Sequence, residues 1–406
     1  MRMPGHTRDQ EAVALAWTAQ SGMKSDRVGR GTGRMRRDRD SQSVIRCRAM
    51  DMNVHPSVRE ATPPPHDATF TRESVALLAL MGIKGLGFRT LSAMMAGDVR
   101  PSDLLAIEDK ADALETLRRF GARVQGGDGV DWGKVRHHAA EKADRTAASF
   151  LQDGIQLLVR KDPRFPPALL DAPSPPHWIF VRGSIEVLHR PAIAAVGTRE
   201  PSEDGRWLTG FLGAQLGQWD APTVSGLAIG VDQLVHEWSL RAGAPTIAVL
   251  GTGILSDYPK GAESLRDRIL TEGGALVTEY LPRETYSAEN FVKRNRLQAA
   301  LGKVLVPLEW NVRSGTGHTV RFATAMRRSI ACLRLPDWSP DRVVLSKSCG
   351  GEAARLFTVP GQEAEFRTFV TQALETTSTS PPTLPTLGTD IESAASATQP
   401  SLFSRS

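Results

Sequence analysis

Turns of small and cationic residues follow two apolar runs near the middle of the chain. The first turn is Gly197-Thr198-Arg199, which comes directly after residues 193–196, and the second begins at Ser225-Gly226. Glycine lets backbone N–H groups approach an anion closely, and a guanidinium offers a planar fork of donors that matches phosphate. The residue types and their order therefore predict a phosphate-binding crevice.

A second group of cations lies about a hundred residues farther along. Lys293, Arg294 and Arg296 stand with Asn295 in a stretch that holds no carboxylate. Cations near the beginning of a helix oppose its dipole, so an anionic ligand would offset an unfavourable arrangement. Phe291, just before them, could stack on a nucleobase. We favour ligand binding here over the alternative, a helix end exposed to water.

Four further polar residues follow other apolar runs. Asp232 and Glu279 could act as acid and base in an enzyme. Alternatively, Asp232 complements a helix dipole and Glu279 is the partner of an arginine in the pocket. Arg313 and Ser314 belong to another small-residue turn and are candidates to line the same pocket.

Two common nucleotide-binding patterns are absent from the sequence. Gly197 does not begin a G-x-G-x-x-G motif, and Ser225 stands where an acid would hold a ribose. No G-x-x-x-x-G-K-[ST] motif occurs either. A dinucleotide-dependent dehydrogenase and an ATP-hydrolysing motor are therefore disfavoured, whereas a small-nucleotide sensor or enzyme stays open.

Apolar runs alternate with amphipathic segments around these turns. We predict strands at 155–159, 178–183, 193–196, 223–225, 246–250, 275–278, 304–308 and 329–333. Helices are expected at about 205–218, 231–242, 261–272, 290–301 and 317–328. This alternation predicts an α/β fold, an extended Rossmann-like, doubly wound, mostly parallel sheet whose ligands bind at the carboxyl ends of its strands.

Composition divides the chain into four segments. Residues 1–70 are predicted to be a disordered basic leader, and residues 71–150 a small helical domain. Residues 151–370 would form the Rossmann-like domain, and the Ser/Thr/Pro-rich residues 371–406 a disordered tail. The leader suits either an arm that binds nucleic acid or a solvated tail, and we favour the latter.

The helical domain should begin with a helix capped by Thr71. A glycine-spaced turn, residues 82–87, and a second helix from Phe88 would follow. This is the pattern of a helix-hairpin-helix or SAM-like domain. Its turn either binds a nucleic-acid phosphate through backbone N–H groups or serves packing alone, and the sequence leaves both open.

Charge and composition exclude several classes of protein. The net charge is +5, and residues 1–50 contribute 11 Lys and Arg against 5 Asp and Glu, so the basic excess belongs to the leader. No apolar run is long enough to cross a membrane. Three cysteines are too few for a disulfide framework or a zinc site. We expect a cytoplasmic protein without membrane, metal or cofactor.

The order of the motifs resembles the DprA/Smf family of DNA-processing proteins. The resemblance covers about residues 154–333, with shorter matches at 357–361 and 71–95. It is carried by Gly197-Thr198-Arg199, residues 225–232, residues 247–253, Tyr258-Pro259, Glu279-Tyr280, residues 291–296, Arg313-Ser314-Gly315 and Val359-Pro360-Gly361. The chain departs from the family pattern at Thr316-Gly317-His318-Thr319 and over residues 335–355.

The resemblance implies a homodimeric, non-enzymatic protein that binds single-stranded DNA in a basic pocket and loads RecA in natural transformation and recombination. It implies that Arg199 binds a phosphate and that Ser225 and Gly226 line the crevice. Lys293, Arg294 and Asn295 would complete the pocket, with Phe291 packed or stacked there. The alternatives are a nucleotide-binding or nucleotide-hydrolysing Rossmann-like sensor or enzyme, and an interaction scaffold with a vestigial crevice.

The segment Gln399-Pro400-Ser401-Leu402-Phe403 resembles the Gln-x-x-Leu-Phe peptide that docks bacterial proteins on the replication sliding clamp. A small apolar anchor on a disordered tether is physically sensible. Short motifs also arise by chance, which we favour here, so the sliding clamp is carried as a hypothesis.

Overall fold

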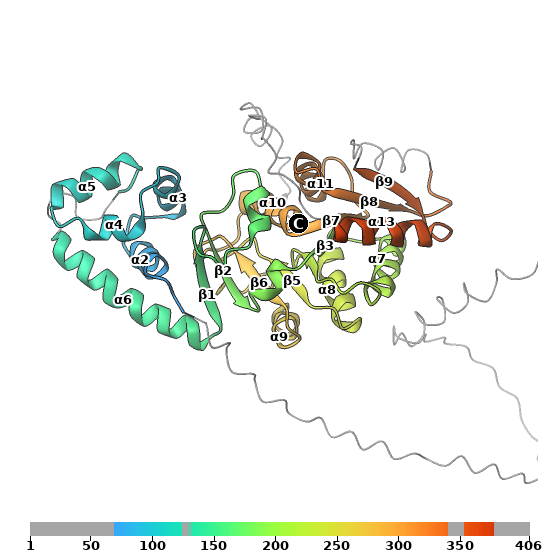
Figure 1. Ribbon diagram of the computed structural model, residues 1–406, viewed down its shortest axis with the longest axis horizontal. Helices are drawn as coiled ribbons and strands as arrows, with labels where there is room; N and C mark the ends of the chain where they lie inside the picture. The colour runs from blue at the N-terminus through green and yellow to red at the C-terminus, as the bar shows by residue number, and fades with distance from the viewer. Residues whose placement is uncertain (1–68, 124–128, 130, 340–352, 377–406) are drawn as a thin grey trace, which may run out of the picture. The chain divides into compact units, whose positions relative to one another are not determined.

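The computed structural model describes residues 69–123, 129, 131–339 and 353–376 (Figure 1). These residues belong to one compact unit that spans residues 60–406. Nearly all of the leader predicted for residues 1–70 lies outside the described ranges, as do the chain beyond residue 376 and the Gln399–Phe403 peptide. Among the described helices, none is long and apolar enough to cross a membrane.

Within these ranges the body of the molecule is a nine-stranded sheet with the order β1-β2-β6-β5-β4-β3-β7-β8-β9. The strands β1 and β2 pair antiparallel, as do β2 and β6, and all other neighbours are parallel. The bounds are β1 Ile155–Val159, β2 Trp178–Gly183, β3 Ala192–Gly197, β4 Thr223–Ser225, β5 Thr246–Val249, β6 Ala275–Thr278, β7 Gly302–Leu308, β8 Ser329–Arg334 and β9 Ala354–Thr358. The predicted fold class is confirmed.

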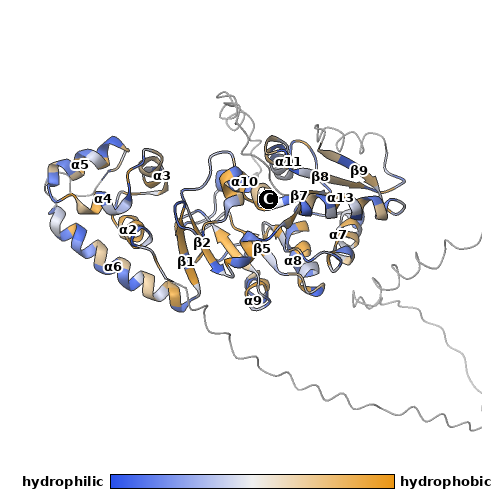
Figure 2. Ribbon diagram, viewed as in Figure 1, coloured by the Kyte–Doolittle hydropathy of each residue, from blue (hydrophilic) through white to orange (hydrophobic). Residues whose placement is uncertain are grey.

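Helices cover both faces of the sheet. Because side chains alternate along a strand, Ala194 and Val196 of β3 pack in one core with α10 and α11, whereas Ile193 and Ala195 pack in another with α7, α8 and α13. The bounds are α7 Glu203–Leu216, α8 Val231–Arg241, α9 Glu263–Thr271, α10 Ala288–Leu301, α11 Gly315–Ala325 and α13 Glu363–Glu375, with short 3₁₀ helices η2 at Pro167–Asp171 and η3 at Glu186–His189. Figure 2 shows the strands as mostly hydrophobic and the helices as two-sided, as burial on both faces of the sheet requires.

Helix α13 is a correction to the sequence analysis. The sequence analysis predicted no helix after residue 328 and a disordered tail from residue 371, but α13 spans Glu363–Glu375. Phe366, Val370 and Ala373 are buried against the core that contains α7. Their spacing of four and three residues places them on one face of the helix, which explains why this segment folds.

The winding of the sheet reverses beside β3. Strands β4, β5 and β6 follow one another on one side of β3, and β7, β8 and β9 follow on the other side. In a doubly wound sheet the loops at such a point diverge and leave a crevice at the carboxyl ends of the strands. The loops after β3 and β7 therefore border the place where a ligand is expected.

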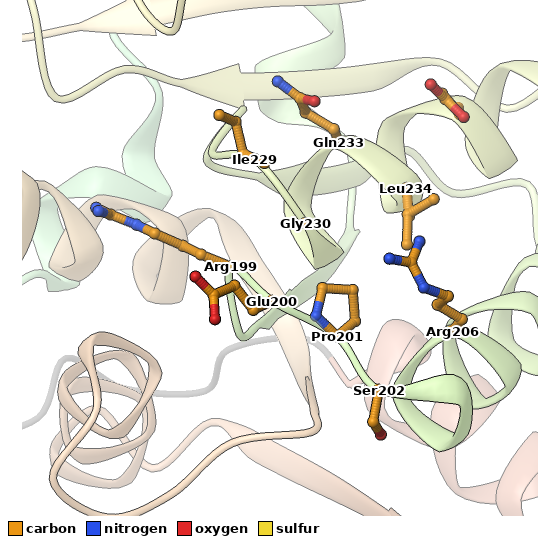
Figure 3. Close-up of a pocket in the computed structure, with 10 residues that line it drawn as sticks. Arg199, Glu200, Pro201, Ser202, Arg206, Ile229, Gly230, Gln233 and Leu234 are labelled. Atoms are coloured by element: carbon orange, nitrogen blue, oxygen red, sulfur yellow. The ribbon is translucent and has the colours of Figure 1, made fainter.

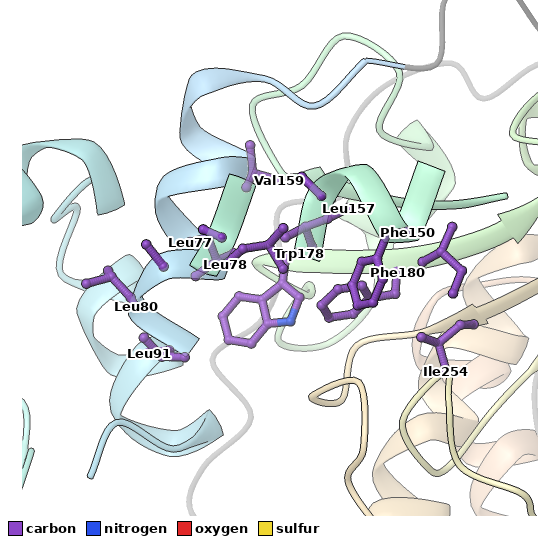
Figure 4. Packing of buried hydrophobic residues seen from close by; sticks show 14 of the residues in the cluster. Leu77, Leu78, Leu80, Leu91, Phe150, Leu157, Val159, Trp178, Phe180 and Ile254 are labelled. Carbon is purple, nitrogen blue, oxygen red and sulfur yellow. The ribbon is translucent and has the colours of Figure 1, made fainter. Parts of the chain in front are cut away.

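The helical segment comprises α2 Arg72–Met81, α3 Phe88–Ala96, α4 Pro101–Ala106, α5 Lys110–Arg119 and α6 Trp132–Gln152. Thr71 caps α2, since its hydroxyl accepts the N–H of Ser74, as the sequence predicts. The Ser74 hydroxyl donates in turn to the carbonyl of Leu157 in β1, at 2.8 Å. Leu77, Leu80 and Trp178 share one core (Figure 4), so the helical segment is packed on the first strands of the sheet.

Candidate functional site

The loop after β3 is held tightly against the beginning of α8. The carbonyl of Thr198 accepts the N–H of Val231 at 3.0 Å. Gly230 has φ +95°, and a Cβ there would collide with the backbone of Thr198 and Arg199. Only glycine fits this conformation and this close approach. The sequence Ile229-Gly230-Val231 thus fixes where the loop of Arg199 lies.

Glu309, which follows β7, locks the same loop from the other side. Its carboxylate accepts the backbone N–H of Ser202 at 2.7 Å and the Ser202 hydroxyl at 2.5 Å. Ser202 is the N-cap of α7. The carboxylate therefore lies at the N-terminus of the first helix after β3, where Rossmann folds commonly hold a phosphate. A Cβ at Gly205 would collide with it.

Arg199 lies beside a cluster of three aromatic rings. Its guanidinium is 5.6 Å from the centroid of Phe291. The Phe291 ring is 5.4 Å from that of Tyr258 and 5.6 Å from that of Tyr286. Arg199 is exposed, whereas Phe291 is buried. The predicted phosphate ligand and the predicted stacking residue, 92 positions apart, are thus brought together by the sheet.

Arg294 and Asp232 form the buried floor of the crevice. The Arg294 guanidinium donates to the carbonyl of Val249. Burial lowers the pKa of Arg294 to about 10, although the charge of Asp232 opposes the shift. Burial also raises the pKa of Asp232, against the nearby charge of Arg294. Both side chains are enclosed by the protein, so neither is open to a ligand.

The turn after β4 runs directly over this floor. A Cβ at Gly226 would collide with the Arg294 guanidinium and approach the Asp232 carboxylate to 2.6 Å. Ser225 is fully buried and donates to the carbonyl of Ala195 at 2.7 Å. Ser225 and Gly226 therefore border the crevice with their backbone atoms, and the Ser225 hydroxyl is used in a hydrogen bond to strand β3.

Helix α10 divides the basic stretch between its faces. Lys293 is exposed and forms an ion pair with Glu289, one turn earlier, at 2.7 Å. Asn295 is buried and donates from Nδ2 to the carbonyl of Gly315 at 3.0 Å, which ties α10 to the beginning of α11. Lys293 faces solvent, while Asn295 positions a neighbouring element.

Glu279 forms an ion pair with Arg296, so its carboxylate is not free for acid–base chemistry. Its two carboxylate oxygens accept from the Arg296 guanidinium at 2.5 and 2.6 Å. The side chains are 6% and 11% exposed, so the pair is shielded from water. The structure thus shows the arrangement in which Glu279 is the partner of an arginine.

Arg313 and Ser314 lie in the loop between β7 and α11. The Ser314 hydroxyl caps α11 by accepting the N–H of Gly317 at 3.3 Å and donates to the carbonyl of Asn311 at 2.6 Å. The Arg313 side chain is exposed at the same edge of the sheet. Ser314 therefore shapes the loop, and Arg313 is available to a ligand.

A groove of about 460 Å³ lies between the loop after β3 and α8. Figure 3 shows Arg199 and Arg206 at opposite ends of this groove. Glu200 and Glu237 also line it, so its charge is mixed. The groove is bordered by the beginnings of α7 and α8.

Exposed apolar side chains share this edge of the sheet. Among the described residues, four large apolar side chains are exposed: Leu170, Ile229, Tyr286 and Val312. Ile229 follows β4, Tyr286 follows β6 and Val312 follows β7. The carboxyl edge thus combines exposed cations with exposed apolar and aromatic surface.

The sequence matches the model of the family described as DNA recombination-mediator protein A over residues 156–354. The chain belongs to the DprA/Smf family. All thirteen candidate site residues lie within the matched region.

Relatives agree with this assignment. The chain is 34% identical over 196 residues to Protein Smf of Synechocystis, covering 47% of this chain and 48% of the relative. It is 33% identical over 244 residues to a putative DNA processing protein DprA of Mycobacterium tuberculosis, covering 60% and 56%. The chain spans about half the length of the curated relatives it matches.

A solved structure agrees as well. DNA processing protein A of Streptococcus pneumoniae superposes with a TM-score of 0.51 at 25% identity, and the match covers 71% of this chain and 95% of that protein. The matched share is larger than the sheet region from residue 155 to 358, so the likeness to that structure extends beyond the sheet.

The sequence analysis missed two residues that border the crevice. Tyr286 drew no attention because it lies in a polar loop without apolar periodicity. Its proximity to Tyr258 follows from the neighbouring ends of β5 and β6, which only the strand order reveals. Glu309 was also missed, because a lone acid after a strand has no distinctive pattern. Its position directly after β7, at the reversal of the sheet, is the signal that could have found it.

Proposed function

We propose that this DprA/Smf chain binds single-stranded DNA at the carboxyl edge of its sheet and catalyses no reaction. One observation carries the proposal: the exposed cation Arg199 and the exposed ring of Tyr286 flank the same side chain, Phe291. Single-stranded DNA presents phosphates and unstacked bases together, and proteins bind it with cationic grooves and aromatic platforms. Double-stranded DNA would offer the phosphates but keep its bases stacked.

The names of the relatives support a role in DNA processing. Proteins of M. tuberculosis and S. pneumoniae that match this chain are described as DNA processing protein DprA. We extend that role to this chain, in the cytoplasm, in natural transformation or another form of recombination. A homodimer that loads RecA, and docking of Gln399–Phe403 on the sliding clamp, belong to the proposal as inferences from resemblance.

Two contacts disfavour the nucleotide-binding alternative. The carboxylate of Glu309 occupies the N-terminus of α7, so a nucleotide phosphate there would meet a negative charge. Glu279, the candidate acid or base, is held by both oxygens to Arg296. Asp232, the other candidate acid or base, is buried.

The test is the affinity for oligo-dT over a series of salt concentrations. Binding to a single strand weakens as salt rises, with a slope in log K against log salt of about −0.7 for each phosphate contacted. We expect Arg199→Ala to weaken binding at low salt and to make the slope shallower by about 0.7.

Arg241→Ala is the matched control. Arg241 is also exposed and also lies over an aromatic ring, at 5.3 Å from the centroid of Trp238, but it ends α8 at the opposite edge of the sheet. Arg241→Ala should leave the affinity for oligo-dT and its salt slope unchanged. Equal effects of the two substitutions, or displacement of oligo-dT by a mononucleotide, would refute the proposed function.

A further inference from the structure

Tyr286 is a largely exposed aromatic residue beside the crevice. The side chain is 53% exposed, although it is one of the largest apolar groups in the described chain. Its ring is stacked on that of Tyr258, with centroids 5.3 Å apart and planes inclined by 24°. One side of Tyr286 is thus covered by a ring, while the residue as a whole remains open to solvent.

The loop that carries Tyr286 is braced by backbone contacts. The carbonyl of Glu284 accepts the N–H of Gly253 at 2.8 Å, and that of Pro282 accepts the N–H of Leu255 at 2.8 Å. The Glu284 carboxylate accepts from Asn290 at 3.0 Å. A Cβ at Gly253 would collide with the carbonyls of this loop. The exposed ring is therefore held in place, and binding to it costs little ordering of the loop.

Phe291, the ring that the sequence analysis expected to stack on DNA, is itself enclosed by neighbouring groups. It is 8% exposed, with the guanidinium groups of Arg199 and Arg294 at 5.6 and 5.4 Å. A Cβ at Gly251 would lie 3.0 Å from the Phe291 ring, so backbone lies close against it. A base could reach Phe291 only by displacing one of these groups, whereas Tyr286 needs no displacement.

We infer that Tyr286 is a base-stacking subsite, on which one nucleobase of single-stranded DNA extends the stack begun by Tyr258. Arg199 and Tyr286 both contact Phe291, so a strand can place a phosphate at the guanidinium and a neighbouring base on the tyrosine. Every nucleobase has a flat aromatic face, so the subsite accepts any base. The inference rests on the proposed function.

The experiment compares oligo-dT with an abasic oligonucleotide of the same length, which keeps the phosphates and lacks the bases. The variants are Tyr286→Leu, which keeps apolar bulk without a flat ring, and Tyr286→Phe, which keeps the ring. We expect Tyr286→Leu to weaken oligo-dT binding about fivefold, the low end of what one stacked base contributes. Its affinity for the abasic strand should be unchanged, and Tyr286→Phe should bind both strands like the parent.

The outcomes separate the subsite from the function. If the parent binds oligo-dT and Tyr286→Leu binds it equally well, the subsite is refuted and the proposed function stands. The subsite is also refuted, and the proposed function stands, if Tyr286→Leu weakens the binding of both oligonucleotides to the same extent, because the lost affinity is then not due to stacking. If the parent binds neither strand at low salt, the proposed function fails and the subsite fails with it.

Discussion

Replacing Glu309 by alanine removes a negative charge from the N-terminus of α7. In the parent the carboxylate accepts two hydrogen bonds from Ser202, at 2.7 and 2.5 Å. Hydrogen bonds to a charged group contribute about 1.5–3 kcal/mol each, and a charge at a helix end adds about 0.5 kcal/mol. Because Ser202 is exposed and can bond to water instead, we expect the free energy of unfolding to fall by about 2 kcal/mol.

The vacated position should then accept an external anion. It offers the backbone N–H and hydroxyl of Ser202 at a helix N-terminus, which are the groups that bind phosphate elsewhere. If inorganic phosphate binds there with a Kd on the order of 10 mM, 100 mM phosphate returns about 1.4 kcal/mol to the variant. The parent should gain little, because its own carboxylate fills the site.

Thermal unfolding measures both effects. The Tm of Glu309→Ala should fall by about 4–6 °C and recover part of that loss in phosphate, relative to sodium chloride of equal ionic strength. Glu309→Gln keeps the shape and one acceptor, so it should lose less and respond less to phosphate. Equal stabilisation of the parent and Glu309→Ala by phosphate would show that the carboxylate does not occupy an anion site.

Two further substitutions test the floor and the core of the sheet domain. Gly226→Ala should lower the free energy of unfolding, measured by chemical denaturation, by about 2 kcal/mol or more, because the new Cβ would collide with Arg294 and crowd Asp232. The control is Gly217→Ala, which should be neutral or stabilising, because Gly217 has φ −63° and a Cβ there would meet no atom closer than 3.9 Å. Burial lowers the pKa of His236 to about 3, below its unfolded value near 6.5, so its contribution to stability is complete above pH 6.5 and is lost as pH falls from there toward 3. His236→Gln should therefore flatten the stability profile between pH 4 and 6 by about 1.4 kcal/mol per pH unit, and an unchanged slope would mean that His236 is not the buried neutral group.

The sheet was predictable because its central strands are buried on both faces. The runs at 193–196, 247–250 and 304–308 hold no charged or hydrogen-bonding side chain, and each lies in or overlaps a strand of the structure. Helix ends were less predictable, since they depend on caps: α7 begins at Glu203 because Ser202 caps it, two residues before the predicted beginning. Helix α13 was missed because its short apolar face adjoins the Ser/Thr-rich sequence that follows.

The site was predicted in its location but not in the direction of its side chains. Lys293, Arg294 and Arg296 read as one patch in the sequence, but successive residues of a helix point about 100° apart. Lys293 accordingly faces water, Arg294 faces the buried floor and Arg296 meets Glu279. Only the packing of α10 on the sheet decides which cation is exposed, and residue types alone do not carry that information.

This division of the cations bears on how the site would hold DNA. Arg296 forms a buried ion pair with Glu279, and Lys293 forms an exposed ion pair with Glu289. Arg294 is buried in the floor of the crevice. The exposed pair of Lys293 and Glu289 is weak enough for a phosphate to displace the carboxylate, but the buried pair is not. Charge is therefore a limited source of affinity at this edge, and the exposed ring of Tyr286 has to supply part of what the enclosed arginines do not. A steep salt slope that survives the combined replacement of Arg199, Lys293 and Arg313 by alanine would contradict this reasoning, because it would require phosphate contacts away from the exposed cations of this edge.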